Sequence, residues 1–411
     1  MFDQSPPDIL DGRRLVFLQG PSSPFFGRVA RACQALGAET LRIGFAPGDR
    51  LYWPARAGRY IAYRGRPEDF PGWLEKTLFA IDATDLVMLG DGRPYHRMAI
   101  DLLRGTPGGP TPWIVEQGYM RPDLIAIEPW GRGARSTIPK AFRQEIPSPP
   151  PALPSAPPAD SFLRYGLLDM GYHLPNLFLG PLLYPHYRPY ALDGPVREYA
   201  GWAAKALHRP LRRQMTVKAQ ARIAQHTGPI FLFPLQLATD FQLRRDGTGA
   251  PQEQVIDQVL TSFHAHAPKD ALLVIKEHPL DNTLRPWWRA ADRNEPSVFY
   301  LPSGDISVLL ARVSGVVTIN STVGLAAILH GIPCHVLGRA IFDMPELTHS
   351  GDPDRFWTEP MTPDPAFAKR FAGFLMHYHV PGTFDGPGAK VGAENVAKRL
   401  ARPFPTLTHR T

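Results

Sequence analysis

The stretch from residue 315 to residue 331 constrains the fold more than any other part of the sequence. Gly315–Ile319 is a short run rich in β-branched residues, which predicts a buried strand. Ser321 or Thr322 then provides an N-cap for an apolar helix, Val323–His330. A strand that leads directly into a helix start points free backbone N–H groups and the helix dipole at whatever lies beyond it. The junction therefore predicts an anion-binding site, although an ordinary βα unit has the same pattern.

A second polar strand end lies upstream, where Lys276-Glu277-His278-Pro279 follows the apolar run Leu272–Ile275. In an open parallel sheet, two polar strand ends can point into one ligand crevice. His278 is a candidate donor to a phosphate or to a leaving-group oxygen. A purely structural histidine is the alternative.

Composition indicates what kind of partner the chain binds. Its 411 residues are enough for two domains, and a net charge of +7 favours an anionic partner such as a nucleotide, an acidic sugar or an anionic lipid. A nucleic acid is not among the expected partners. The best apolar run, Leu174–Tyr184, is broken by Pro175 and Pro181 and is too short to span a membrane. The N-terminus shows no secretion signal, and the two cysteines are far apart, so we expect a cytoplasmic protein.

Strands and helices alternate along the chain, which predicts α/β domains with parallel, doubly wound sheets. Strands are expected at residues 14–19, 39–43, 86–89, 112–115, 229–234, 272–275, 315–319 and 334–337, and helices at 25–36, 73–81, 97–104, 252–267, 307–311 and 323–330. Two Rossmann-like domains that face a central cleft make up the GT-B arrangement of glycosyltransferases, and this is the predicted architecture.

The expected boundaries follow from composition. An N-terminal Rossmann-like domain covers residues 1–160 and ends in the proline-rich linker Pro147–Pro158, to which we assign no function. A helical connecting segment covers 161–225, and a C-terminal Rossmann-like domain covers 226–365. Residues 366–411 form a helix and tail that are expected to pack back on the N-terminal domain.

Two carboxylates are the candidate catalytic groups. Glu116 and Asp240 each follow a predicted strand, one in each half of the chain. Glycosyl transfer with retention needs such a pair, one as nucleophile and the other as general acid/base. A helix cap or a salt bridge is the alternative for either residue alone. The sequence has no Asp-x-Asp, Walker A, GxGxxG or zinc-ligand pattern, so we expect no metal and no bound cofactor.

These residues belong to a series of ordered motifs. They read Leu18-Gln19-Gly20-Pro21, Gly90-Asp91-Gly92-Arg93-Pro94-Tyr95-His96-Arg97, Glu116-Gln117-Gly118-Tyr119-Met120-Arg121-Pro122, Pro234-Leu235-Gln236, Lys276-Glu277-His278-Pro279, Asn320-Ser321-Thr322-Val323-Gly324 and Gly338-Arg339-Ala340-Ile341-Phe342-Asp343-Met344-Pro345. In them the chain resembles the capsule polysaccharide biosynthesis and export proteins of the KpsS type. These proteins are related to retaining β-Kdo transferases, which use CMP-Kdo (Kdo is 3-deoxy-D-manno-oct-2-ulosonic acid).

The resemblance implies a role for each motif. Asp240 would be the nucleophile, Glu116 the acid/base, and His278 and Ser321 contacts to the phosphate of CMP. The nucleotide-binding set in the C-terminal domain comprises Lys276, His278, Asn320, Ser321 and Thr322. The residues expected at the acceptor or in the cleft are Gln19, Asp91, Arg93, His96, Tyr119, Arg121 and Gln236. The family motif usually reads Glu-Glu-Gly-Tyr, whereas this chain has Gln117 at the second position.

The resemblance thus implies transfer of β-Kdo from CMP-β-Kdo to an anionic glycerolipid on the inner face of the cytoplasmic membrane. A second Kdo transferase and the capsule export machinery would be its partners. The alternatives are a non-catalytic export or assembly factor and a GT-B enzyme that uses another nucleotide sugar. A basic segment, residues 205–222, lies in a region without acidic residues and is the expected membrane contact, with a solvated helix face as the alternative.

Overall fold

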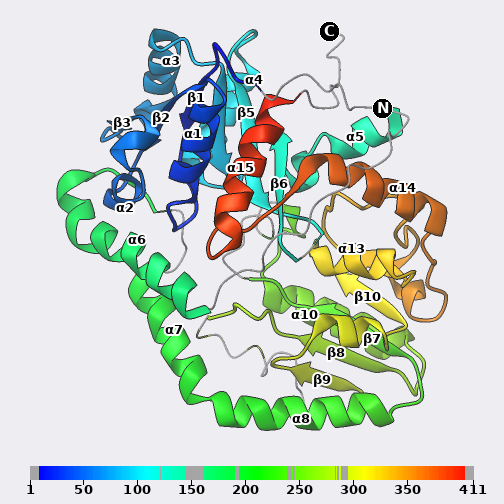
Figure 1. Ribbon diagram of the computed structural model, residues 1–411. Coiled ribbons are helices and arrows are strands. Elements are labelled where there is room, and N and C mark those ends of the chain that lie inside the picture. Colours follow the sequence, from blue (N-terminus) through cyan, green and yellow to red (C-terminus); the bar gives the residue numbers. More distant parts are fainter. Residues whose placement is uncertain are drawn as a thin grey trace. The chain divides into compact units, whose positions relative to one another are not determined.

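The computed structural model describes residues 9–120, 122–144, 162–189, 194–237, 246–282 and 295–402, with Leu243, Leu284 and Trp287. The chain forms two compact units, residues 1–190 with 373–411 and residues 191–372. Each unit contains its own β-sheet with helices packed on it (Figure 1).

The sheet of the first unit has the strand order β12-β6-β5-β4-β1-β2-β3. Its strands are β1 (Arg14–Phe17), β2 (Glu39–Gly44), β3 (Arg59–Ala62), β4 (Asp85–Leu89), β5 (Thr111–Gln117), β6 (Leu124–Pro129) and β12 (His379–Pro381). Its helices are α1 (Phe25–Ala35), α2 (Pro47–Leu51), α3 (Phe70–Ala80), α4 (Pro94–Arg104), α5 (Ile138–Gln144), α6 (Phe162–Leu183) and α15 (Gly388–Ala401). Strands β1 to β5 pair in parallel, whereas β6 runs antiparallel to both β5 and β12.

Chain ends far apart in sequence meet in this unit. Helix α15 packs along α1, and Ser23 donates a hydrogen bond of 2.7 Å to the carbonyl of Phe384 (Figure 1). The core beneath the sheet includes Val16, Ile43 and Met88, which are fully buried. Consecutive buried residues along β4 are typical of a parallel strand that is covered on both faces.

The sheet of the second unit has the order β11-β10-β7-β8-β9, and all of its pairings are parallel. Its strands are β7 (Ile230–Pro234), β8 (Leu272–Lys276), β9 (Val298–Leu301), β10 (Gly315–Thr318) and β11 (Cys334–Val336). Its helices are α7 (Pro195–Leu207), α8 (Arg209–Gln225), α10 (Gln252–His266), α12 (Ile306–Leu310) and α13 (Thr322–Leu329), with most of α14 (Pro365–Leu375). Short 3₁₀ turns in the two units lie at Ala55–Ala57, Pro67–Asp69, Gly133–Arg135, Pro353–Trp357 and Met376–Tyr378.

The expected α/β class with two Rossmann-like sheets is confirmed, and these are the components of the GT-B fold. One expectation was wrong: the first sheet is not entirely parallel, because β6 and β12 run antiparallel at its edge. Strand β6 follows β5 after a short turn, which leaves no room for the crossover that parallel pairing requires. The helical section expected over 161–225 is divided between the units: α6 belongs to the first, and α7 and α8 to the second. The Pro147–Pro158 segment lies outside the described residues.

Candidate functional site

Glu116 lies at the end of β5, next to the turn that leaves β4. Its Oε1 accepts a hydrogen bond of 3.1 Å from the backbone N–H of Gln117. Gly90, at the start of the turn, has a φ of +64°, and a Cβ built on it would lie 2.9 Å from Oε2 of Glu116. The backbone conformation therefore favours glycine here, and a larger residue would also require the Glu116 carboxylate to shift. The carboxylate is half-buried, so it can meet a ligand while its position is fixed by the neighbouring strand end.

Arg132 is the buried cation beside this carboxylate. Its guanidinium lies 4.2 Å from the ring centre of Tyr119 and donates to the carbonyl oxygen of Gln117. Its backbone N–H donates to Oδ2 of Asp91 over 3.1 Å. Burial lowers the pKa of Arg132, but Tyr119, Glu116 and other acidic neighbours outweigh burial and raise the pKa overall. Arg132 thus supplies a permanent positive charge near Glu116.

Behind Arg132 lies a buried chain of hydrogen bonds. The hydroxyl of Tyr119 donates to Oε1 of Glu128 over 2.7 Å, and its backbone N–H donates to Nε2 of His379 over 2.9 Å. Nδ1 of His379 donates to the carbonyl of Leu375, so the ring is a neutral tautomer. Burial raises the pKa of Glu128 to about 7 and lowers the pKa of His379 to about 4. Tyr119 is therefore held on both sides and cannot rotate freely.

The side chains of the Gly90–Arg97 motif hold the β4–α4 turn. His96 is fully buried, and its Nδ1 donates to the carbonyl of Gly90 over 2.9 Å. Burial, followed by the charge of Arg93, lowers the pKa of His96 to about 3. Arg93 donates to the carbonyl of Gly20 over 3.0 Å and so connects this turn to the end of β1.

Gln19 belongs to a separate buried network in the same unit. Its amide donates to the hydroxyl of Tyr187 over 2.9 Å and, more weakly, to Oδ2 of Asp49 over 3.4 Å. Asp49 also accepts from Arg42 at 2.6 Å and from the hydroxyl of Tyr172 at 2.9 Å. This network fastens α6 and the segment after it to the ends of β1 and β2.

In the second unit, the junction between β10 and α13 has the expected cap. Oγ of Ser321 accepts from the backbone N–H of Val323 over 3.2 Å. The side chains of Asn320 and Gln236 are joined: the Gln236 amide donates to Oδ1 of Asn320 at 2.7 Å, and the Asn320 backbone N–H donates to Oε1 of Gln236 at 3.2 Å. The structure therefore brings together the ends of β7 and β10, with Ser321 and Thr322 partly exposed at the helix start.

The polar residues at the end of β8 differ in how far they are exposed. Lys276 and Glu277 are buried, whereas His278 is partly exposed. Nδ1 of His278 accepts from the backbone N–H of Leu280 over 3.2 Å, which leaves Nε2 to carry the proton of a neutral ring. Burial is the main cause that lowers the pKa of Lys276. His278 thus presents a donor atom, as a phosphate contact requires.

Glu277 changes the interpretation of the basic segment 205–222. Arg212 donates to both of its carboxylate oxygens, at 3.0 and 2.7 Å, and Lys205 lies 3.2 Å away. The hydroxyl of Tyr300 also donates to it. Arg222 lies over the ring of Phe299 at 4.0 Å. A buried carboxylate therefore binds Lys205 and Arg212 inside the unit, and contact between segment 205–222 and a membrane stays a prediction.

Asp240 and Arg121 lie outside the described residues. Of the site residues predicted from the sequence, the structure groups Glu116, Asp91 and Tyr119 in the first unit, and Gln236 and Asn320 in the second. Sequence reasoning missed Arg132, Glu128 and His379. The signal for Arg132 was available, since Trp130-Gly131-Arg132-Gly133 is a glycine-rich turn directly after a strand.

The chain matches the family model described as "Capsule polysaccharide biosynthesis protein" over residues 84–384, and it belongs to that family. The "Capsule polysaccharide export protein KpsS" of Escherichia coli is 31% identical over 385 residues, which cover 90% of this chain and 95% of that protein. The "Capsule polysaccharide modification protein LipB" of Neisseria meningitidis serogroup B is 30% identical over 370 residues, which cover 85% of this chain and 86% of that protein. The resemblance found from the motifs is thereby confirmed.

Among solved structures, the β-Kdo 2,7 transferase of Thermosulfurimonas dismutans KpsC matches with a TM-score of 0.45 and 12% identity, and the match covers 93% of this chain and 99% of that chain. An overall likeness of this size says nothing about substrate. In the described part of the chain, no helix has the length and apolar character needed to cross a membrane.

Proposed function

We propose that the protein is a retaining glycosyltransferase that transfers β-Kdo from CMP-β-Kdo to an anionic glycerolipid of the (lyso)phosphatidylglycerol type. Its product starts the linker that carries capsular polysaccharide. One observation carries this proposal: a protein of a capsule biosynthesis family holds a half-buried carboxylate, Glu116, in a place built for it by Gly90 and Arg132.

The chemistry divides between two carboxylates. In the first step, Asp240 attacks the anomeric carbon of Kdo, the bond from that carbon to the phosphate oxygen breaks, and CMP leaves. In the second step, the acceptor hydroxyl attacks the glycosyl ester while Glu116 removes its proton, and Asp240 is released as a carboxylate. Two inversions at the anomeric carbon give retention. Arg132 supports this assignment because it places a buried, permanent positive charge near the Glu116 carboxylate.

The start of α13 supports the binding of CMP. The backbone N–H of Thr322 lies at a helix N-terminus, where a phosphate is favoured, and the hydroxyl of Ser321 is a second donor, while the backbone N–H of Ser321 donates to Oγ1 of Thr318. Gln236 fixes this turn through Asn320, and Nε2 of His278 is a further donor. Lys276 adds positive charge at the end of β8. This donor set binds a phosphate without a divalent ion, so the proposal includes no metal and no cofactor.

Release of CMP from CMP-Kdo in the presence of lysophosphatidylglycerol is the direct test. Asp240→Asn should abolish turnover, by about a thousandfold or more. Glu116→Gln should allow the first step and slow the second, so that mass spectrometry finds a Kdo adduct on the protein. Near-normal turnover in Asp240→Asn would reject the nucleophile assignment.

The same assay separates the alternatives. A non-catalytic export or assembly factor, as the name of the Escherichia coli relative suggests, would release no CMP from any CMP-sugar. A GT-B enzyme for another donor would turn over a different nucleotide sugar and leave CMP-Kdo intact. The expected partners are a second Kdo transferase that extends the product and the capsule export machinery. The expected location is the inner face of the cytoplasmic membrane.

A further inference from the structure

Helix α6 carries an exposed apolar face in the first unit. Of the 21 large apolar side chains that are exposed in the described residues, nine lie on this helix. They are Tyr165, Leu167, Met170, Leu174, Leu177, Phe178, Leu179, Leu182 and Leu183. Phe178 and Leu182, one helical turn apart, are 74% and 79% exposed. Single exposed apolar residues are ordinary, but a contiguous row marks an interaction surface.

The opposite face of α6 holds the helix firmly to its unit. The hydroxyl of Tyr52 donates to the carbonyl of Leu168 over 2.6 Å, and Oδ1 of Asn176 accepts from the backbone N–H of Gly48 over 2.7 Å. Tyr172 is buried against Asp49, as described above. These bonds fix the orientation of the helix, so its apolar row stays exposed.

Charge is distributed so that the apolar row lies between two groups of cations. Between Tyr165 and Leu183 the one Asp, Glu, Lys or Arg is Asp169, which lies 3.5 Å from His173. Near the start of the helix, burial lowers the pKa of Arg28, and the charges of Arg164 and Arg31 lower it further, so these three cations lie close together. Both Arg31 and Arg164 are exposed.

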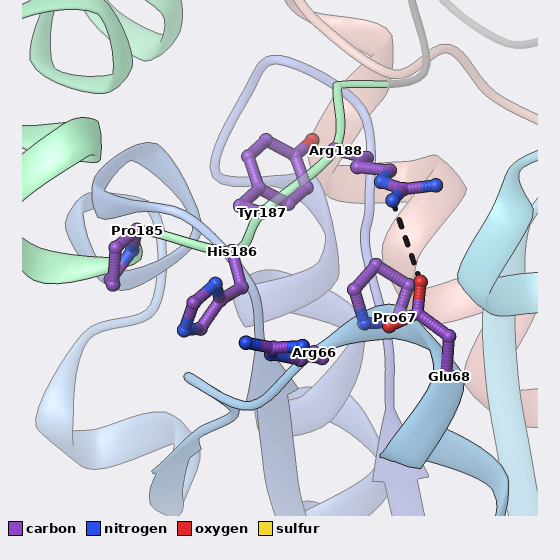
Figure 2. A pocket seen from close by; sticks show the side chains of 7 residues that line it. All are labelled: Arg66, Pro67, Glu68, Pro185, His186, Tyr187 and Arg188. Atoms are coloured by element: carbon purple, nitrogen blue, oxygen red, sulfur yellow. Dashed lines mark hydrogen bonds and ion pairs between the residues drawn. The ribbon is translucent and has the colours of Figure 1, made fainter.

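At the other end of the helix, the chain enters a basic pocket of about 370 Å³ (Figure 2). It is lined by Arg66, Pro67, Glu68, Pro185, His186, Tyr187 and Arg188. Glu68 is the acidic group of this lining, and Arg188 binds it at 3.4 Å. Arg64 adds a further cation, since its guanidinium lies 5.7 Å from the ring centre of Tyr184. The pocket therefore offers cations directly after the apolar row ends.

We propose that the exposed face of α6 and the cations at its two ends form a docking surface for an anionic phospholipid bilayer. In the described part of the chain no helix is long and apolar enough to span a bilayer, but α6 can lie in the interface with its apolar side chains among the acyl chains. The flanking arginines then meet lipid phosphates, each contributing to attraction by an anionic leaflet. This inference rests on the proposed function, because a lipid acceptor would be presented at a membrane. It adds to that function the surface by which the protein would reach the acceptor. This surface replaces segment 205–222 as the main contact.

Vesicle sedimentation tests the surface without any reaction. The full chain should pellet with phosphatidylglycerol vesicles and not with phosphatidylcholine vesicles at the same salt. The double variant Phe178→Gln with Leu182→Gln should weaken this binding by about tenfold or more, since two large apolar groups no longer enter the bilayer. The matched control is Phe79→Gln on α3, where the side chain is 88% exposed in the same unit, and it should bind as the wild type does.

A fluorescent label tests which part of the first unit contacts the vesicles. Both native cysteines are buried, so Phe178→Cys can be labelled with an environment-sensitive dye, with Phe79→Cys as control. Vesicles should shift the emission at position 178 to shorter wavelength and leave position 79 unchanged. Equal shifts at both positions would overturn the proposal.

Other results would overturn it as well. If Arg209→Glu with Arg213→Glu abolished sedimentation while the Phe178 and Leu182 double variant still bound, the contact would lie on α8. If wild-type chains bound no vesicles but formed dimers that the double variant lost, the row would be an interface between copies. Transfer of Kdo to a lysolipid below its critical micelle concentration separates these failures from the proposed function: the double variant should retain this transfer and lose transfer to an acceptor held in vesicles.

Discussion

Glu116 occupies the space that any side chain at residue 90 would need. Oε2 of Glu116 would lie 2.9 Å from a Cβ on Gly90, and the φ of +64° at Gly90 already disfavours other residues. The Glu116 carboxylate at the end of β5 can thus lie this close to the end of β4 because residue 90 has no Cβ. The position of the candidate acid/base depends on a residue that takes no part in the chemistry.

Gly90→Ala should therefore displace the carboxylate of Glu116 and lower transfer by about tenfold or more, since small displacements of reacting groups are costly. It should also lower the free energy of unfolding by about 1–2 kcal/mol, because alanine is strained at positive φ. Gly105→Ala is the control, since its φ is −87° and its nearest contact for an added Cβ is 3.5 Å. CMP release and urea unfolding measure the two effects. An unchanged transfer rate in Gly90→Ala would show that Glu116 does not depend on Gly90.

Local sequence patterns were sufficient for most of the first unit's parallel core. The apolar run of β4, followed directly by Gly90, predicted a strand within a residue of its observed limits. Strand β12 was missed, since its three residues are defined only by antiparallel pairing with β6. Strands β3 and β9 were missed for a related reason: each is four residues long at a sheet edge. Such strands depend on a partner strand and carry little local signal.

Glu128 should make stability depend on pH near neutrality. Burial raises its pKa from 4.5 to about 7, so the folded state prefers the neutral acid. This contribution is complete below pH 4.5 and is lost as the pH rises through about 7, a change of roughly 3 kcal/mol. Glu128→Gln keeps an acceptor for Tyr119 and does not titrate. Compared with the variant, wild-type protein should lose stability between these pH values in urea unfolding. A difference that is constant with pH would contradict the assignment.

The contribution of His96 to stability should change with pH in the opposite direction. Burial lowers its pKa from 6.5 to about 3, so the folded state prefers the neutral ring. Its contribution is complete above pH 6.5 and is lost as the pH falls toward 3, at about 1.4 kcal/mol per pH unit. His96→Asn retains a donor for the carbonyl of Gly90 without the titration. Urea unfolding between pH 7 and pH 5 should give a steeper loss for wild-type protein than for the variant, and parallel curves would exclude this role.

As with the fold, some residues of the candidate site could be predicted from the sequence and others could not. Glu116 and Ser321 could be predicted because each stands next to a strand end within one continuous motif. Arg132 had a local signal, the glycine-rich turn after β6, whereas His379 could not be placed beside Tyr119 from the sequence, since their contact joins segments far apart in the chain. The basic segment shows the same limit: a cation run indicates charge but does not show which members a buried carboxylate such as Glu277 will bind.

Glu277 should contribute strongly to the stability of the second unit. It is 5% exposed and binds Arg212, Lys205 and Tyr300. Glu277→Gln leaves two cations without their carboxylate, which should cost roughly 3 kcal/mol. Glu359→Gln removes an exposed ion pair with Arg355 and should change stability by less than about 0.5 kcal/mol. Thermal unfolding of both variants measures the contrast, and equal effects would mean that Glu277 is no more than a surface charge.

Ser321 and His278 should together hold the phosphate of CMP. Ser321→Ala combined with His278→Ala should weaken CMP binding by roughly 2–4 kcal/mol, since each removes a hydrogen bond to a charged group. Because Oγ of Ser321 also caps α13, its loss destabilises the helix start, and a control for that effect is needed. Asp352→Ala removes a comparable cap, the bond from Asp352 to the backbone N–H of Asp354, at a site outside the proposed set. It should lower stability and leave CMP affinity unchanged. Calorimetry with and without EDTA checks the result: a site made of the Ser321 hydroxyl, the backbone N–H of Thr322 and the His278 imidazole binds CMP equally in both, whereas binding that EDTA abolishes would require a metal and reject this donor set.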